Sequence, residues 1–382
     1  MTHVWLEAIV EKLGESTALA LTGLGVGIAF GFLGQRSRFC LRSAVIEFAR
    51  NLTGGKLTVW LFAFATAVLA TQALALAGWF DASQSRQIAA RGSLSGAAVG
   101  GALFGIGMIL ARGCSSRLLI LAAQGNLRSL ISGLVFAVAA QAAWTGALAP
   151  VREAISAWWT VDGGLSRDLI ARTGIGHGGA MLFGAVWLLA AIVWARRQRV
   201  ETRAWAGAIG VGLTIAAAWW ATYAIAQVSF DPHPVQSLSF TGPSAEVLSR
   251  VLFSSDKPPT FDLGLVPGVF IGAFIAAALF GELKLEGFQG GASMSRYIVG
   301  ATCMGFGGML AGGCAVGAGL SGTAVFTITA YVTLTAMWAA AAITDRLLDR
   351  HPTGVLDQAM PRPLQAATST AMAAEPVTTS FR

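Results

Sequence analysis

The chain has 382 residues, of which 55% are hydrophobic and only 12% are charged. A soluble domain carries about 25% charged residues, so this chain has roughly half the charge that a water-exposed surface needs. The formal net charge is +7, but no basic run is interleaved with aromatic residues, which argues against a nucleic-acid partner. A basic balance of this kind is typical of cytoplasmic loops in membrane proteins. The composition therefore predicts a chain that is largely covered by lipid.

The first segment, 1–16, lacks the features of a cleaved signal peptide. Acidic residues, Glu7, Glu11 and Glu15, stand where a signal peptide carries positive charge. Its apolar residues recur at helical spacing, which predicts a short helix lying in the membrane interface.

Apolar stretches long enough to span a bilayer recur along the rest of the chain. A spanning helix needs about 20 residues. Candidate spans lie near 17–34, 57–79, 94–111, 127–149, 178–195, 205–226, 263–281, 297–311 and 323–343. The third and the eighth are short and rich in glycine, so we expect short or re-entrant helices there. The fold class predicted is an all-α polytopic membrane protein with about nine transmembrane helices. The tail 344–382 is expected to be cytoplasmic and disordered.

Loop charges predict the orientation of these spans. Segments 35–56, 112–128 and 196–203 are rich in arginine, whereas 227–262 carries two basic and four acidic residues. Positively charged loops remain in the cytoplasm. The N-terminus is therefore expected outside and the C-terminus inside.

The chain contains an internal repeat. When 100–114 is aligned with 300–314, seven of fifteen positions are identical, and both copies end in a Gly-Cys pair. Glycine-rich membrane helices resemble one another by composition, but composition does not explain a rare cysteine shared at the same position. The repeat predicts one transmembrane domain, 17–343, with halves at about 17–150 and 263–343 joined by spans at 178–226.

The two copies are predicted to be inverted. The eighth candidate span follows the third by five steps, and an odd number of steps reverses the direction of the second copy. Inverted-topology repeats are typical of secondary transporters, where the substrate site lies near the interface between repeats.

The four cysteines include no Cys-x-x-Cys pair and no nearby histidine, so we predict neither a disulfide framework nor a metal site. Cys303 aligns with Leu103 in the repeat and is interpreted as a small buried hydrophobe. Cys40, Cys114 and Cys314 lie in glycine- and serine-rich stretches. A thiol is a weak donor with a polarizable acceptor, which suits a sulfur-containing anion.

The stretches after the two Gly-Cys pairs contain too much glycine and serine for a lipid-facing helix, so we expect them to line a polar path. Helices are expected to begin at about 118 and 323, after irregular turns, and the backbone N–H groups at these starts would attract an anion. Arg38 and Arg117 lie beside these motifs, although arginines that merely follow the positive-inside rule are an equal alternative. The predicted substrate-binding residues are Cys40, Cys114, Cys314, Arg38, Arg117, Ser115, Gly113, Gly313, Gly317 and Ser321.

Three strings resemble a known family. They are Gly-Phe-Leu-Gly-Gln-Arg-Ser-Arg-Phe-Cys (31–40), Gly-Cys-Ser-Ser-Arg (113–117) and Gly-Gly-Cys-Ala-Val-Gly-Ala-Gly-Leu-Ser-Gly (312–322), which closely resemble the YeeE/YedE sulfur-transport family. The resemblance implies thiosulfate uptake across the bacterial inner membrane, inverted pseudosymmetry, and cysteines that guide the anion along a narrow path. By motif these are Cys40, Cys114 and Cys314. The two Gly-Cys copies differ in the residues that follow, and 150–176 matches no motif.

The leading hypothesis is a transporter for thiosulfate or a related small sulfur-containing anion. Its partners would be that anion, membrane lipid and a cytoplasmic sulfurtransferase. No P-loop and no cofactor motif occur, so no cofactor is predicted. The alternative is a membrane sulfurtransferase or redox enzyme that carries sulfur as a persulfide, for which Cys114 beside Arg117 would supply the activated thiolate. No second cysteine is spaced nearby in sequence to resolve such an intermediate.

Overall fold

The computed structural model describes residues 7, 10–52, 54–253, 258–287 and 291–348. Predictions about 349–382 and most of 1–9 lie outside these residues. Of the described residues, 76% are helical, and they form one two-stranded antiparallel sheet, β1 (Gly92–Ser93) with β2 (Thr160–Val161). Contacts divide the chain into two units, Met1–Ala342 and Ile343–Arg382. The described residues of the second unit, 343–348, form the C-terminal end of the last helix, α16 (Ile328–Leu348).

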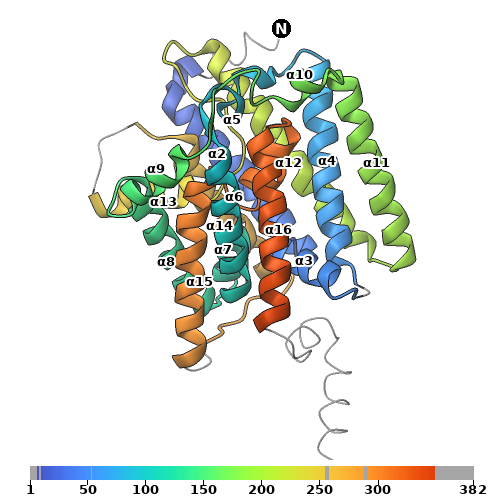
Figure 1. Ribbon diagram of the computed structural model, residues 1–382, viewed down its shortest axis with the longest axis vertical. Helices are drawn as coiled ribbons and strands as arrows, with labels where there is room; N and C mark the ends of the chain where they lie inside the picture. The colour runs from blue at the N-terminus through green and yellow to red at the C-terminus, as the bar shows by residue number, and fades with distance from the viewer. Residues whose placement is uncertain (1–6, 8–9, 53, 254–257, 288–290, 349–382) are drawn as a thin grey trace, which may run out of the picture. The chain divides into compact units, whose positions relative to one another are not determined.

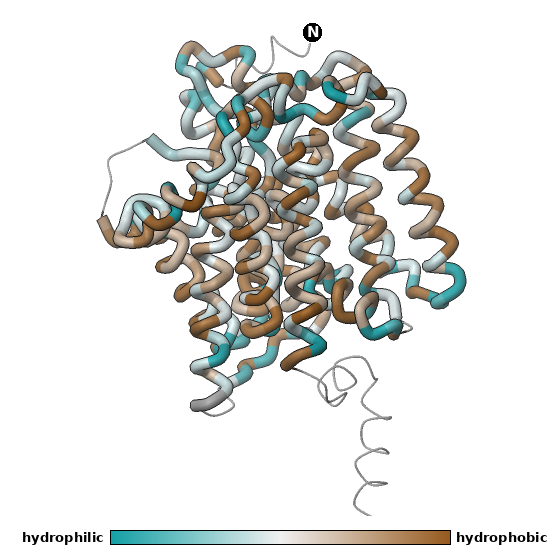
Figure 2. Tube along the Cα trace, in the orientation of Figure 1, coloured by the Kyte–Doolittle hydropathy of each residue, from teal (hydrophilic) through white to brown (hydrophobic). Residues whose placement is uncertain are grey.

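Within the described ranges, seven helical segments are long and apolar enough to cross a membrane. They comprise α2 (Glu15–Ser37) with α3 (Leu41–Ala49), α4 (Lys56–Leu76), α6 (Leu94–Leu110) with α7 (Ser115–Ala123), α8 (Leu127–Trp144), α11 (Gly176–Arg197), α12 (Thr202–Val228) and α14 (Phe261–Leu279). Apolar residues follow these helices along most of their length, and polar residues gather at their ends (Figure 2). The prediction of an all-α polytopic membrane protein is confirmed.

Two further long helices, α15 (Gly291–Leu310) and α16 (Ile328–Leu348), coincide with the last two predicted spans. Shorter helices connect the long ones, namely η1 (Ala82–Gln84), α5 (Arg86–Ala89), α9 (Ala149–Ala157), α10 (Leu169–Thr173), α13 (Thr241–Phe253) and the π-helix η2 (Gly317–Gly322). In the view of Figure 1, other helices flank α6, α7, α14 and α16 on both sides, and α4 lies beside α11.

Polar caps fix where several helices begin. Ser93 accepts a hydrogen bond from the N–H of Gly96 at the start of α6, at 2.8 Å. Asn126 accepts one from Ser129 at the start of α8, also at 2.8 Å. Such caps satisfy backbone donors that a helix leaves unpaired, which matters most where lipid supplies no hydrogen bonds.

Glycines let α2 and α14 approach closely in a parallel orientation. A β-carbon added at Gly27 would lie 2.5 Å from the carbonyl oxygen of Leu265, and one at Gly268 would lie 2.4 Å from that of Leu24. Small residues at this spacing are typical of tightly packed transmembrane helices.

The repeated segments α6 and α15 pack antiparallel, and their contacts are reciprocal. A β-carbon at Gly100 would lie 2.5 Å from the carbonyl oxygen of Gly307, and one at Gly307 would lie 2.7 Å from that of Gly100. Gly107 and Gly300 meet in the same way, at 2.5 and 2.8 Å. Reciprocity of this kind is the geometry of a two-fold contact.

The helix α12 packs parallel to α4 and antiparallel to α2. Phe62 stacks on Trp205 with ring centroids 5.6 Å apart, and Phe80 packs on Trp219 at 5.4 Å. From the first contacting pair to the second, the residue numbers increase on both sides, so α4 and α12 run in the same direction.

Short helices follow the cysteines directly. Cys40 is the N-cap of α3, and Cys114 is the N-cap of α7. We predicted that 115–117 would be irregular and that a helix would begin near 118. That prediction is wrong, because α7 begins at Ser115 and packs against α8 and α14 instead of facing lipid. After Cys314 the chain forms the π-helix, and α16 begins at Ile328, five residues later than expected from the apolar pattern.

Candidate functional site

Cys40 and Cys114 form a buried pair of thiols. Their side chains interact with each other, and all four cysteines of the chain are free. The backbone N–H of Ser43 donates to the sulfur of Cys40, and that of Arg117 donates to the sulfur of Cys114. The hydroxyl of Ser116 lies 3.4 Å from the Cys114 sulfur. Both sulfurs therefore sit at helix starts, among hydrogen-bond donors.

Positive charge surrounds this pair. The guanidinium of Arg117 interacts electrostatically with both thiols, and its Nη1 donates to Oε1 of the buried Gln35 over 3.4 Å. Lys56 interacts electrostatically with Arg117 and Cys40. The positive charges would attract an anion here, and the low dielectric of the surroundings strengthens that attraction. We call Cys40, Cys114 and their basic neighbours the inner thiol site.

Cys314 lies in a different set of contacts. Its sulfur accepts hydrogen bonds from the backbone N–H of Phe240 at 3.3 Å and of Gly317 at 3.4 Å, and the residue is fully buried. The chain at 229–240 therefore folds in so that one N–H reaches the sulfur. We call Cys314 with these two donors the outer thiol site.

Polar contacts hold the π-helix of the outer thiol site in place. The hydroxyl of Ser321 donates to the carbonyl of Leu238 at 2.7 Å, and the indole N–H of Trp219 donates to the carbonyl of Ser321 at 3.3 Å. The amide of Gln87 donates to the carbonyl of Gly317 at 3.1 Å. A π-helix leaves irregular backbone groups, and here side chains from several elements satisfy them.

Buried aromatic rings connect the two thiol sites. Phe30 packs on Phe240 with centroids 5.4 Å apart and on Phe39 at 6.5 Å, and all three rings are essentially inaccessible. Phe240 donates to the Cys314 sulfur, and Phe39 directly precedes Cys40. The rings thus form a continuous apolar contact from one thiol site to the other.

The structure sorts the predicted site residues into two groups. Cys40, Cys114, Arg117, Ser115 and Gly113 belong to the inner thiol site or adjoin it, while Cys314, Gly313, Gly317 and Ser321 belong to the outer one. The Ser115 hydroxyl is buried without a hydrogen-bond partner. Arg38 lies at the surface, with 56% of its side chain exposed, but it interacts electrostatically with Arg117.

Sequence reasoning missed Gln35, Phe30 and Phe240. Gln35 is one of the few buried polar residues at the end of a candidate span, which was a usable signal. Phe240 stands 200 positions after Cys40, the offset of the Gly-Cys repeat, but no identity marks the alignment there. Phe30 gives no signal, because apolar residues fill the spans on every face.

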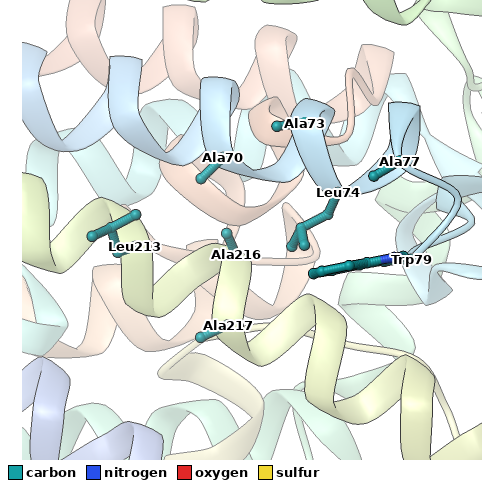
Figure 3. A pocket seen from close by; sticks show the side chains of 8 residues that line it. All are labelled: Ala70, Ala73, Leu74, Ala77, Trp79, Leu213, Ala216 and Ala217. Atoms are coloured by element: carbon teal, nitrogen blue, oxygen red, sulfur yellow. The ribbon is translucent and has the colours of Figure 1, made fainter. Parts of the chain in front are cut away.

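No group of three possible metal-ligating side chains occurs in the described ranges. A cleft of about 540 Å³ opens between α4 and α12, lined by Leu74, Trp79, Leu213 and five alanines (Figure 3). Nearly all of its lining is hydrocarbon. Its lining side chains include no cation and no thiol.

Seven apolar helices in the described ranges that can cross a membrane, together with the match to a transport family, define a polytopic membrane transporter rather than an enzyme. The chain belongs to the sulphur transport family, whose model matches residues 36–343. It is 25% identical over 354 residues to the thiosulfate transporter TsuA of Escherichia coli K12, covering 84% of this chain and 92% of that protein. It is also 25% identical over 327 residues to the thiosulfate transporter TsuA of Spirochaeta thermophila, covering 81% and 93%.

Proposed function

We propose that this protein imports thiosulfate, or a closely related small sulfur-containing anion, across the bacterial inner membrane. The anion passes from the outer thiol site to the inner thiol site along the buried aromatic contact. The relatives named as thiosulfate transporters support the substrate. The observation that carries the path is that two separate buried thiol sites each present N–H donors to sulfur, with Phe30 packed between them.

The contacts support an inverted two-fold repeat with nine spans, in which α15 and α16 cross the membrane. α6 and α15 meet antiparallel and reciprocally at Gly100 and Gly307. The pairing of α2 with α14 corresponds to that of α4 with α12. These pairs favour a second half that begins at α12, earlier than the sequence boundary of about 263.

With this arrangement, each thiol site is assigned to one side of the membrane. With the N-terminus outside and the C-terminus inside, the arginine-rich inner thiol site faces the cytoplasm and the outer thiol site faces the periplasm. The anion therefore moves from a neutral thiol site toward positive charge. A cytoplasmic sulfurtransferase would be a chemically suitable acceptor.

Uptake of radiolabelled thiosulfate tests the proposal. Cells lacking other importers would express the wild type or one of Cys40→Ala, Cys114→Ala and Cys314→Ala, with Cys303→Ala as the matched control. We expect the first three to lose most uptake and the control to keep it, because Cys303 lies outside both thiol sites. Uptake that survives all three substitutions would overturn the thiol path. A persulfide on Cys114 during turnover would favour the sulfurtransferase instead, since Cys40 could then resolve it.

A further inference from the structure

Glu282 is placed to control the cytoplasmic side of the inner thiol site. It lies in the turn after α14, where Gly281 has a φ of 64° and the N–H of Glu282 donates to the carbonyl of Ala277 at 2.8 Å. Its Oε1 lies 3.7 Å from Arg36 Nη1 and 3.8 Å from Arg38 Nη2. One carboxylate therefore faces both arginines of the motif that leads to Cys40.

A buried amide connects this carboxylate to the thiols. The side-chain N–H of Gln35 donates to Oε2 of Glu282 at 2.6 Å, and its Oε1 accepts from Arg117 at 3.4 Å. Gln35 is only 3% exposed. Arg117 in turn interacts electrostatically with Cys40, Cys114 and Glu282. Through Gln35, any movement of Glu282 changes the surroundings of the arginine that faces the thiols.

Aromatic packing holds the carboxylate's partners in position. The Arg36 guanidinium lies over the ring of Phe280, 3.6 Å from its centroid, and Phe280 packs on Phe32 at 6.4 Å. A cation held over a ring in this way gains additional stabilisation. Arg36 is thus positioned before any anion arrives.

We propose that Glu282 is a built-in competitor for the transported anion. It engages the arginines of the exit, so that an anion leaving the inner thiol site exchanges with this carboxylate and is released to the cytoplasm. Conduction requires binding strong enough for entry and weak enough for exit. Arg36, Arg38 and Arg117 without Glu282 would hold an anion too firmly. This inference rests on the proposed function.

Kinetics of thiosulfate uptake test it with Glu282→Gln, which removes the charge but keeps an acceptor for Gln35. We expect both KM and the maximal rate to fall by roughly two- to fivefold, the size of effect that a partly exposed ion pair exerts. Glu282→Asp keeps the charge, so its KM and maximal rate should lie between those of the wild type and those of Glu282→Gln. A variant that only destabilises the fold would lower the maximal rate per cell and leave KM unchanged.

Glu286→Gln is the matched control. Glu286 lies in the same connection, but it accepts from Asn126 at 2.6 Å and pairs with Lys284 at 3.4 Å, away from the exit arginines. Wild-type kinetics are expected for this control. A Glu282→Gln variant with unchanged or raised KM overturns the inference while the wild type still transports. Absence of uptake by the wild type overturns the proposed function instead.

Discussion

The backbone N–H of Phe240 points at the sulfur of Cys314 from 3.3 Å away. Cys40, which stands 200 positions earlier, approaches Cys114 with its side chain, so that one thiol site holds two sulfurs and the other holds one sulfur and a phenyl ring. The two thiol sites therefore differ in chemistry. The difference gives the proposed path a direction, from a single thiol toward a thiol pair surrounded by positive charge.

The contact between Cys40 and Cys114 predicts that a mild thiol oxidant will join them and stop uptake. Each thiol loses a proton and an electron as the S–S bond forms, and the oxidant diamide takes up both electrons and both protons. A disulfide would fix α3 to α7 and remove both thiols from the path. We expect thiosulfate uptake to fall in wild-type cells and to return with dithiothreitol.

Intact-mass measurement checks the same prediction, since the oxidised protein should lose the mass of two hydrogens. Cys303→Ala should behave as the wild type does, because Cys303 is not part of the pair. Loss of these two hydrogens in Cys40→Ala would show that a different pair of cysteines reacts.

The sequence was sufficient to predict the helical membrane fold and the Gly-Cys repeat, because both depend on local composition and spacing. It could not predict the contact between Cys40 and Cys114, which depends on how α2 packs against α7 in three dimensions. It also placed the start of α7 too late, because a buried helix tolerates Ser115 and Ser116 where a lipid-facing one does not. The sequence marks Gln35 as a polar residue at the end of a span, but it could not predict its two partners, which come from α7 and from the turn after α14.

Glycine packing between α2 and α14 predicts that two glycine-to-alanine substitutions in α2 will differ in their effect on thermal stability. Gly27→Ala would place a β-carbon 2.5 Å from the carbonyl oxygen of Leu265, whereas Gly25→Ala meets nothing within 4 Å. Overpacking of this kind costs about 1–3 kcal/mol. We expect a lower midpoint of thermal unfolding in detergent for Gly27→Ala and an unchanged or higher midpoint for Gly25→Ala. Equal midpoints would mean that the two helices separate easily.

The contacts of Arg167, in the segment 150–176 that matched no motif, predict that substituting this residue will lower thermal stability more than substituting a nearby exposed arginine. Arg167 is 7% exposed, and its guanidinium donates to the carbonyl of Ala90 at 2.5 Å and to the hydroxyl of Thr329 at 2.7 Å. Burial lowers the pKa of Arg167 to about 10, so the group is still charged at neutral pH.

Arg167→Met removes both hydrogen bonds, and a single one to a charged group contributes about 1.5–3 kcal/mol. We expect a lower midpoint of thermal unfolding. The exposed Arg172 supplies the control, because Arg172→Met should change the midpoint little. A larger decrease in the midpoint for Arg172→Met than for Arg167→Met would contradict the stabilising role that we assign to the hydrogen bonds of Arg167.

The inverted repeat predicts that corresponding positions before the two Gly-Cys pairs lie on opposite sides of the membrane. Arg112 and Gly312 are both exposed and have φ values of 55° and 74°. Since an arginine already adopts this backbone conformation at 112, a cysteine should be accepted at 312. A membrane-impermeant maleimide applied to intact cells should label Gly312→Cys and leave Arg112→Cys unlabelled, with the reverse in inside-out vesicles. The wild type, in which Cys40, Cys114 and Cys314 are buried and Cys303 is half-buried, supplies the background labelling. Labelling of both variants from one side would exclude the inverted arrangement.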